Sequence, residues 1–459
     1  MKQGFLWGVA AASYQIEGAA HEGNRGPSIW DTFSHTPGKV LNGDTGDVAI
    51  DHYHRIEEDV KLMVELGVNV YRFSIAWPRL FPQNSQSIEQ QGVDFYNKLI
   101  DTLVAHNIEP VATLYHWDLP QYLEDKGGWA SRDIVYAFEH YAKTCTELFG
   151  DRVNKWITLN EPWCTSFLGY YLGIHAPGIK NAASAVAAAH HTALAHAYGT
   201  RAIKAVAPNA QVGITVNMTN LRTDSDDPET KLNWQLVDAN QNRWWIDAFT
   251  SGKYPEVLVK EYGVLLSQVF QEGDEKLLKV DNDFLGVNYY CDGFVGKARI
   301  TDRPMNVHSP YPINRTANMD LPETEFVSRT DFNWPITPEG LGNLVLRINR
   351  DWSEIKSILI TENGAAFNDG PNEHGEIEDH RRVDYIHSHL ESLRHAIDLG
   401  APVDGYFAWS LWDNYEWAEG YSKRFGIVYV DFDTLKRTPK LSFKMYQKYI
   451  AQTRLALNS

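Results

Sequence analysis

Cysteine is scarce in this sequence. Its 459 residues include only Cys145, Cys164 and Cys291. An odd number of cysteines without a Cys-x-x-Cys spacing predicts neither a disulfide framework nor a zinc site. Cys164 could be interpreted as a redox thiol, but because no pattern of a base accompanies it, we expect a packed, apolar side chain. Sparse cysteine is also typical of a reducing compartment, and we expect a cytoplasmic location.

Long apolar runs and an excess of basic residues are also missing. No apolar run reaches the roughly 18 residues that a membrane-spanning helix needs. The first ten residues contain one charged side chain and a short apolar stretch that leads directly to Ser13, so they predict a first strand rather than a signal peptide. Lys and Arg number 42 against 59 Asp and Glu, which gives a formal net charge of −17. Because this negative field repels phosphate groups, we expect neither a nucleic acid nor a membrane as partner.

Aromatic residues, by contrast, are plentiful. Trp occurs 15 times, and Phe, Trp and Tyr together make up 12% of the chain. A high tryptophan content indicates either a heavy core or sugar binding, since the apolar face of a pyranose stacks on an indole ring. Composition alone favours the core and leaves sugar binding open. A hydrophobic share of 43% with only 22% charged residues argues against disorder.

Eight short apolar or β-branched runs alternate with segments of helical periodicity. The runs are residues 5–10, 69–75, 110–115, 155–159, 211–217, 284–290, 357–361 and 405–409. Clear helical segments are residues 55–66, 93–106, 133–149 and 182–205. This alternation predicts an α/β fold, a single (β/α)8 TIM barrel that forms one domain over residues 1–459. Residues 297–334, rich in Asn, Pro, Thr and Asp, are predicted to be a loop insertion rather than a second domain.

The predicted helices commonly end at glycine or asparagine. Gly67, Asn107, Gly150 and Gly400 each follow the last residue of a helical pattern. We expect these residues to adopt the left-handed conformation that ends a helix and opens the loop into the next strand.

Polar residues follow most of the predicted strands. They are Arg72, residues 116–118, residues 160–162, Asn217, residues 288–290, residues 362–364 and Trp409. A single such cluster would be interpreted as a helix cap or a solvated loop. Seven clusters in phase with seven strands predict a shared functional face, because the carboxyl ends of barrel strands meet on one side.

Two glutamates stand out among these residues. Glu161 ends the fourth predicted strand and Glu362 ends the seventh. Both could be acids that cap the helix following them. As a pair facing one cavity, they fit the cleavage of a glycosidic bond, which needs one proton donor for the leaving oxygen and one carboxylate for the anomeric carbon.

Four motifs give the chain a family resemblance. They are FLWGVAAASYQIEGA at 5–19, TLNEP at 158–162, ITENG at 360–364 and WSLWDNYEW at 409–417 with the following GY and RFG. In this order and spacing they resemble glycoside hydrolase family 1, the β-glucosidase-like retaining glycosidases. A lone NEP or ENG would carry little weight, but the match covers essentially the whole chain.

The resemblance implies a role for each matched residue. Glu362 would be the nucleophile, and Glu161 would be the general acid and then the general base. The residues that would bind the sugar are Gln15, His116, Asn160, Tyr290, Trp409, Glu416 and Trp417, with Trp409 as the stacking platform. Arg72 and Asn288 would support the nucleophile. Retention of configuration implies carboxyl groups about 5–5.5 Å apart.

The aglycone side is less defined. Trp163, Asn217 and Trp334 lie where the family's aglycone subsite would be. Trp334, in an Asn-Trp-Pro sequence, could equally pack within its own loop. Trp412 either shapes the cavity floor or fills the core.

The substrate implied is a small-molecule β-glucoside or cello-oligosaccharide, and the resemblance leaves β-galactoside and β-fucoside activity open. No metal or organic cofactor is expected, because two carboxyls and a water complete the chemistry. The spacing of His190, His191 and His196 does not place two ligands on one helix face at i, i+4, so we expect buried or capping roles for them.

Three alternatives remain open. A 6-phospho-β-glycosidase is disfavoured because such relatives carry a small residue, typically Ser, where this chain has Glu416, and a carboxylate there would repel a phosphate. A non-catalytic sugar-binding relative is disfavoured because both Glu161 and Glu362 are present. A thioglucosidase is disfavoured because the family's plant thioglucosidases lack the acid that Glu161 supplies.

Overall fold

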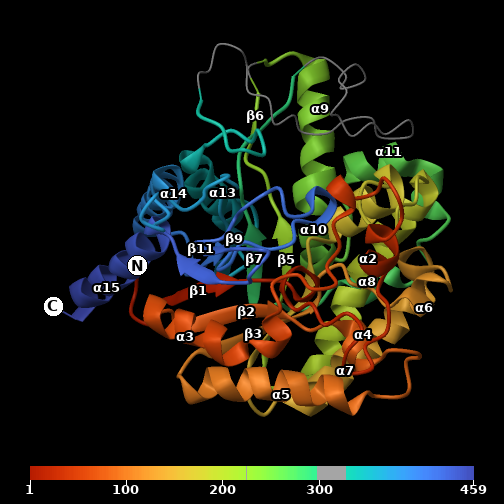
Figure 1. Cartoon of the computed structure of the whole chain (residues 1–459). Helices are drawn as coiled ribbons and strands as arrows, with labels where there is room; N and C mark the ends of the chain where they lie inside the picture. The colour runs from red at the N-terminus through yellow and green to blue at the C-terminus, as the bar shows by residue number, and fades with distance from the viewer. Residues whose placement is uncertain (224, 297–326, 459) are drawn as a thin grey trace.

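The protein is a closed barrel of eight parallel strands with helices between them (Figure 1). The computed structural model describes residues 1–223, 225–296 and 327–458. The strand order around the barrel is β1-β10-β9-β7-β5-β4-β3-β2. Their bounds are β1 Leu6–Ala10, β2 Val70–Ser74, β3 Glu109–Tyr115, β4 Lys155–Asn160, β5 Gln211–Asn217, β7 Phe284–Asn288, β9 Ile358–Asn363 and β10 Val403–Trp409. The predicted barrel is confirmed, with all eight strands at or within a few residues of the predicted runs.

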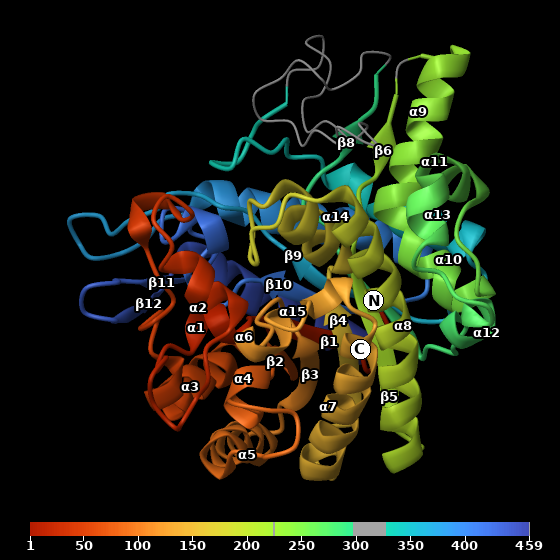
Figure 2. The same cartoon turned by 90° about the vertical axis from the view of Figure 1, so that its right-hand side faces the viewer.

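The helices surround the barrel (Figure 2). They are α1 Ser13–Ile16, α2 Ile29–Ser34, α3 Ile56–Leu66, α4 Trp77–Leu80, α5 Gln90–Ala105, α6 Gln121–Glu124, α7 Asp133–Phe149, α8 Ala182–Val206, α9 Pro228–Asp238, α10 Trp244–Ser251, α11 Glu256–Ser267, α12 Asp274–Leu278, α13 Pro338–Asp351, α14 His380–Asp398 and α15 Leu441–Asn458. A π-helix, Cys164–Leu172, follows β4. In the described ranges, no helix combines the length and apolarity needed to cross a membrane.

Amphipathic patterning fixes how the helices pack. In α3, Ile56, Val60 and Met63 recur at the spacing of one helix face, and all three are buried in the hydrophobic core. Helix α15 contacts the first strand of the barrel. The Tyr446 hydroxyl of α15 donates to the carbonyl oxygen of Gly8 in β1 at 3.0 Å.

Three of the four predicted helix-ending residues are left-handed. The φ angles are 80° at Gly67, 58° at Asn107 and 100° at Gly400. The prediction for Gly150 is wrong, because its φ is −68° and its N–H continues the helical pattern by donating to the Thr146 carbonyl. Glycine is suited to this position for another reason: a Cβ there would lie 2.5 Å from the Thr146 carbonyl oxygen.

Within residues 1–223, 225–296 and 327–458, four short strands lie outside the barrel. They are β6 Leu221–Arg222, which pairs with β8 Gly293–Phe294, and β11 Val428–Val430, which pairs with β12 Arg437–Pro439. The predicted insertion at 297–334 falls mainly outside the described residues, since the described chain resumes at residue 327. Its described end includes an isolated bridge between Arg329 and Pro335.

Candidate active site

The predicted functional residues gather at the carboxyl ends of the barrel strands. Glu161 directly follows β4, Glu362 lies near the end of β9, and Asn288 ends β7. All three side chains are buried. Because all eight strands run parallel, these ends open on one face of the barrel.

Glu362 is held by two donors. Arg72 Nη1 lies 2.6 Å from Glu362 Oε1 in an ion pair, and the Tyr290 hydroxyl donates to Oε2 at 2.6 Å. Arg72 is itself buried and donates from Nη2 to Asn160 Oδ1 at 2.6 Å. The guanidinium therefore fixes both the nucleophile candidate and the amide next to the acid candidate.

Glu161 is held by a different set of groups. Asn288 Nδ2 donates to Glu161 Oε1 at 2.6 Å, and the Cys164 thiol donates to Oε2 at 3.0 Å. The carboxylate thus contacts side chains rather than the amides of the following helix, so the helix-cap interpretation is not what the structure shows. Glu161 has a φ of 46°, a left-handed conformation that non-glycine residues rarely adopt, at the turn from β4 into the helix.

Two amides connect the carboxyl groups. Asn160 Oδ1 accepts from Arg72 Nη2 and, at 3.1 Å, from Asn288 Nδ2. Thr361 Oγ1 donates to Asn288 Oδ1 at 2.7 Å, which fixes the orientation of that amide. A continuous hydrogen-bonded path therefore runs from Glu362 to Glu161, with a full positive charge only at the Glu362 end.

The electrostatics of the two glutamates differ accordingly. Burial and the charge of Glu362 raise the pKa of Glu161 to about 7. Burial also raises the pKa of Glu362, but the charge of Arg72 and the hydrogen bond from Tyr290 oppose that rise. Glu362 is therefore the carboxyl that ionises first, and Glu161 is the one that keeps its proton near neutral pH.

The residues predicted to bind the sugar also converge here. Gln15 Nε2 donates to the Tyr415 carbonyl at 2.8 Å and to Glu416 Oε2 at 3.3 Å. Burial and the charges of Glu362 and Glu161 raise the pKa of Glu416 to about 8. At neutral pH Glu416 therefore carries a proton in most molecules, which its sequence position does not reveal.

His116 is neutral and has a fixed tautomer. Burial, with the charge of Arg72, holds its pKa well below the usual range. Because Asn160 Oδ1 accepts from Arg72, its Nδ2 faces His116 and donates to Nε2 at 3.0 Å, which leaves the proton on Nδ1. Within the described ranges, His116 Nδ1 and Gln15 Oε1 are buried polar atoms with no hydrogen-bond partner, as groups that bind sugar hydroxyls would be.

Two tryptophans lie beside His116. The ring centroids of Trp409 and Trp417 lie 5.9 and 6.0 Å from that of His116, with interplanar angles of 23° and 21°. The Trp409 backbone also lies close to Gly364, the residue after β9. A Cβ at Gly364 would lie 1.7 Å from the Trp409 carbonyl oxygen, so no larger residue fits there. This contact gives a physical reason for the glycine of the ITENG motif.

The aglycone candidates are partly buried. Asn217 ends β5 and is in register with Asn288 of β7. The ring centroids of Trp334 and Tyr290 are 5.4 Å apart, but Trp334 also stacks on Phe332 at 4.5 Å. Trp334 therefore packs within its own loop and also contacts Tyr290, which binds Glu362.

Trp163 lies close to Glu161 in the sequence. It lies two residues after Glu161, and its ring centroid is 5.8 Å from that of Phe167. Its Nε1 is buried and has no hydrogen-bond partner among the described residues.

Other residues singled out in the sequence take structural positions. His190 contacts Asp274 at 2.8 Å, His191 contacts the Trp129 carbonyl at 2.9 Å and His196 contacts the Thr158 hydroxyl at 2.7 Å. All three histidines are buried, as predicted. Trp412 is fully buried beside His52 and Tyr71, so it fills the core. The part of the chain that the structure describes contains no group of three or more His, Cys, Asp or Glu side chains arranged to hold a metal ion.

Two side-chain contacts around Glu161 and Asn288 were not predicted from the sequence. The sequence predicted an apolar packing residue at Cys164, whereas the thiol donates to Glu161. No prediction was made for Thr361, whose hydroxyl orients Asn288. The available signals were weak: Cys164 stands three residues after the acid in the turn leading into a helix, and Thr361 directly precedes the nucleophile candidate.

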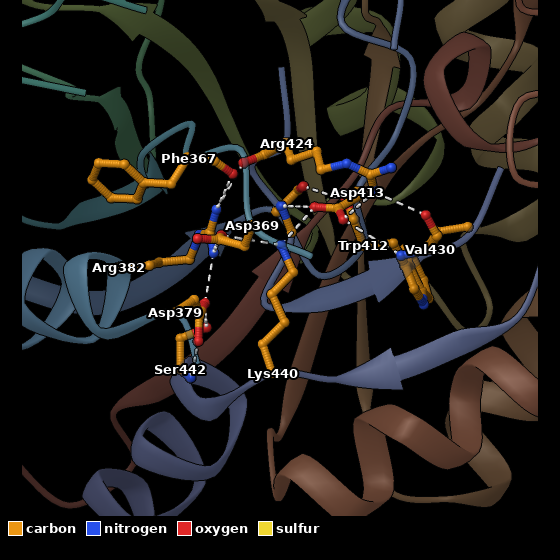
Figure 3. Close-up of polar contacts among 12 residues, drawn as sticks. Phe367, Asp369, Asp379, Arg382, Trp412, Asp413, Arg424, Val430, Lys440 and Ser442 are labelled. Atoms are coloured by element: carbon orange, nitrogen blue, oxygen red, sulfur yellow. Dashed lines mark hydrogen bonds and ion pairs between the residues drawn. The ribbon is translucent and has the colours of Figure 1, made fainter. Parts of the chain in front are cut away.

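A largely buried ion-pair network surrounds Asp413 (Figure 3), which lies three residues before Glu416 in the sequence. It combines three acidic and three basic side chains, namely Asp369, Asp379, Asp413, Arg382, Arg424 and Lys440. Asp413, in the same segment as Glu416, pairs with Lys440 at 2.9 Å and with Arg424 at 2.7 Å. The equal numbers of opposite charges allow the network to be buried without an unpaired ion.

Comparison with known proteins identifies the family. Residues 1–455 match the model of glycosyl hydrolase family 1. The chain is 43% identical over 449 residues to β-glucosidase A of Acetivibrio thermocellus, covering 97% of each chain, and 42% identical over 460 residues to the bifunctional β-D-glucosidase/β-D-fucosidase of Bifidobacterium breve, covering 98% of each. It superimposes on the β-glucosidase of Thermotoga maritima in complex with deoxynojirimycin with a TM-score of 0.89, at 40% identity and 98% coverage of each chain. The protein belongs to glycosyl hydrolase family 1.

Proposed function

We propose that this protein is a retaining β-glucosidase that removes terminal, non-reducing β-D-glucosyl residues from β-glucosides and cello-oligosaccharides. One observation carries the proposal: of two buried glutamates linked by a hydrogen-bonded path, Glu362 pairs with Arg72 while Glu161 keeps a raised pKa of about 7. This asymmetry supplies an ionised nucleophile and a protonated acid at the same pH. The relatives named β-glucosidase support the choice of sugar.

In the first step, an oxygen of Glu362 attacks the anomeric carbon while the bond to the leaving oxygen breaks. Glu161 transfers its proton to that oxygen, and the aglycone departs as an alcohol. Arg72 and the Tyr290 hydroxyl keep Glu362 in its ionised form and oriented for attack. The product is a glycosyl ester on Glu362.

In the second step, a water attacks the same carbon and the ester bond breaks. Formation of the ester has removed the charge of Glu362, so the pKa of Glu161 falls and its carboxylate accepts the proton of the water. Glucose leaves with its β configuration, and both glutamates return to their starting states.

The remaining pocket residues hold the sugar and the aglycone. We assign the glucosyl hydroxyls to Gln15, His116, Asn160, Glu416 and Trp417, and the stacking platform to Trp409. The proposed aglycone contacts are Trp163, Asn217 and Trp334. No metal or cofactor enters these steps.

Two broader expectations belong to the same proposal. The chain forms one catalytic domain, and the protein acts in the cytoplasm. The chain has only three cysteines, Cys145, Cys164 and Cys291, and all three are buried, which suits a reducing compartment. Fractionation of the source cells with an antibody against the protein tests the location.

The mechanism is tested by trapping the ester. A 2-deoxy-2-fluoro-β-glucoside with a good leaving group should inactivate the enzyme. The fluorine slows both formation and breakdown of the ester, whereas the good leaving group speeds only its formation, so the ester accumulates. Peptide mapping should place the label on Glu362, and NMR should show β-glucose as the first product from an ordinary substrate. A label on another residue, or α-glucose as first product, would overturn the proposal.

A further inference from the structure

The Cys164 thiol is in direct contact with the carboxyl proposed as the proton donor. Its Sγ lies 3.0 Å from Glu161 Oε2, and its backbone N–H donates to the Glu161 carbonyl at 2.9 Å. The side chain is buried at the start of the π-helix Cys164–Leu172. Side chain and backbone of Cys164 therefore both tie the turn after β4 to Glu161.

The other oxygen of Glu161 has a fixed donor. Asn288 Oδ1 accepts from the Thr361 hydroxyl, so the Asn288 amide must present its Nδ2 to Glu161 Oε1. An amide N–H can donate but cannot accept. Since a proton on Oε1 would face this donor, the acid form of Glu161 carries its proton on Oε2, beside Cys164.

A thiol suits the position beside Oε2. It is a weak donor that can rotate, and its sulfur is also a weak acceptor. Burial and the charge of Glu161 hold the pKa of Cys164 well above its usual range, so the thiol stays protonated at working pH. Cys164 can therefore donate to the carboxylate form and rotate away from the acid form.

We propose that Cys164 is a positioning residue that stabilises the ionised form of Glu161 and so sets the pH at which the proton donor is lost. A donor to Oε2 favours the carboxylate over the acid. The proposal rests on the function proposed above, because it assigns a role to Cys164 through Glu161.

Other charged and titratable groups also act on Glu161. They come from separate elements: Arg72 from β2, Tyr290 after β7, Glu362 from β9 and Glu416 after β10. Replacement of Cys164 removes none of these groups, so a shift of the alkaline limb in the variant reports the loss of the thiol.

The test compares Cys164→Ala with Cys164→Ser. The two variants lose similar volume, but only serine retains a donor for Oε2. With phenyl β-glucoside, whose leaving group needs protonation, the alkaline limb of kcat/KM in Cys164→Ala should move up by about 0.4 to 1 pH unit, the shift expected for loss of one hydrogen bond from a weak donor. In Cys164→Ser the limb should stay at or below its wild-type position. Cys145→Ala, which removes a buried thiol in α7, serves as control and should leave the limb unchanged.

A second measurement does not depend on the stability of the alanine variant. The infrared S–H stretching band of Cys164 should move to lower frequency as Glu161 ionises in the wild type. The change should persist in Cys145→Ala and be absent in Glu161→Gln.

The two proposals fail in different ways. Identical alkaline limbs in the wild type, Cys164→Ala and Cys164→Ser, or an S–H band that does not respond to pH in the wild type, would overturn the role of Cys164. An alkaline limb that survives in Glu161→Gln would instead overturn the assignment of the acid.

Discussion

Arg72 forms an ion pair with Glu362 at 2.6 Å, whereas its hydrogen bonds lead to Glu161 through the amides of Asn160 and Asn288. One buried guanidinium thus separates two chemically identical side chains into an ionised and a protonated form. The assignment of roles depends on this separation, and it can be tested by removing either glutamate.

Removal of the nucleophile should abolish turnover. In Glu362→Ala we expect a loss of roughly four to six orders of magnitude in kcat, because the glycosyl ester cannot form. Azide or formate should restore part of the activity and give a product of inverted configuration, since the small anion occupies the space of the missing carboxylate. The measurement is the steady-state rate with a nitrophenyl glucoside, with circular dichroism to show that the variant folds. Substantial unaided activity would contradict the assignment.

Removal of the acid should affect substrates according to their leaving groups. In Glu161→Gln, kcat/KM for phenyl β-glucoside should fall by about 10² to 10⁴, the usual contribution of a general acid. The kcat/KM for dinitrophenyl glucoside should fall far less, because its leaving group departs without protonation. Equal losses on both substrates would show that Glu161 is not the proton donor.

The pH profile provides a separate check on the acid. With the pKa of Glu161 raised to about 7, wild-type kcat/KM should decline as the pH rises through that value, because the proton is lost. The acid limb should follow protonation of Glu362 at lower pH. In Glu161→Gln the alkaline limb should flatten, whereas an unchanged limb would move the acid role elsewhere.

Glu416 should determine discrimination against 6-phosphoglucosides. With its pKa raised to about 8, Glu416 carries a proton at neutral pH and becomes a carboxylate in alkali, where it repels a phosphate dianion. We expect the wild type to prefer nitrophenyl β-glucoside over its 6-phosphate. The ratio of the two kcat/KM values should rise between about pH 6.5 and 9. This range lies above the second pKa of the phosphate, which is about 6. Taking a ratio cancels the titration of Glu161 and Glu362.

Two variants isolate the contribution of Glu416. Glu416→Gln keeps the shape of the side chain without its charge, so the ratio should become nearly independent of pH. Glu416→Ser should lower glucoside turnover and narrow the preference. A wild type that hydrolyses the 6-phosphate as well as the glucoside would replace the proposed β-glucosidase with a 6-phospho-β-glycosidase.

The ion-pair network should contribute strongly to stability. Lys440 is fully buried and pairs with Asp413, so Lys440→Met should lower the free energy of unfolding by about 3 kcal/mol by leaving part of a buried charge unpaired. Lys143→Met breaks a pair with Glu147 in which both side chains are about half exposed, and it should cost under about 1 kcal/mol. Urea unfolding of both variants measures the difference. Equal effects would show that the network does not stabilise the fold.

The sequence predicted the barrel because its signals are local. Apolar runs mark the strands, and the polar residues after them mark one face, so Glu161 and Glu362 could be paired without a structure. The contact of Cys164 with Glu161 depends on a side-chain direction after a left-handed residue, which spacing does not determine. The raised pKa of Glu416 depends first on its burial and then on carboxyls contributed by β9 and by the turn after β4, far away in the chain. Gly150 was misread because close approach to a carbonyl and a left-handed φ favour the same residue type.

The hydrogen bond from Gln15 to Glu416 joins groups 401 positions apart, next to the seam where β1 pairs with β10. During synthesis from the N-terminus, Gln15 is therefore made almost at the beginning, and its partner Glu416 emerges only near the end. If glucose binds both Gln15 and Glu416, as we propose, it can bind only after the seam has formed. Its binding then reports completion of the barrel rather than folding of any one part. By the same linkage, a ligand bound across the seam would oppose its opening and slow the release of the terminal strands.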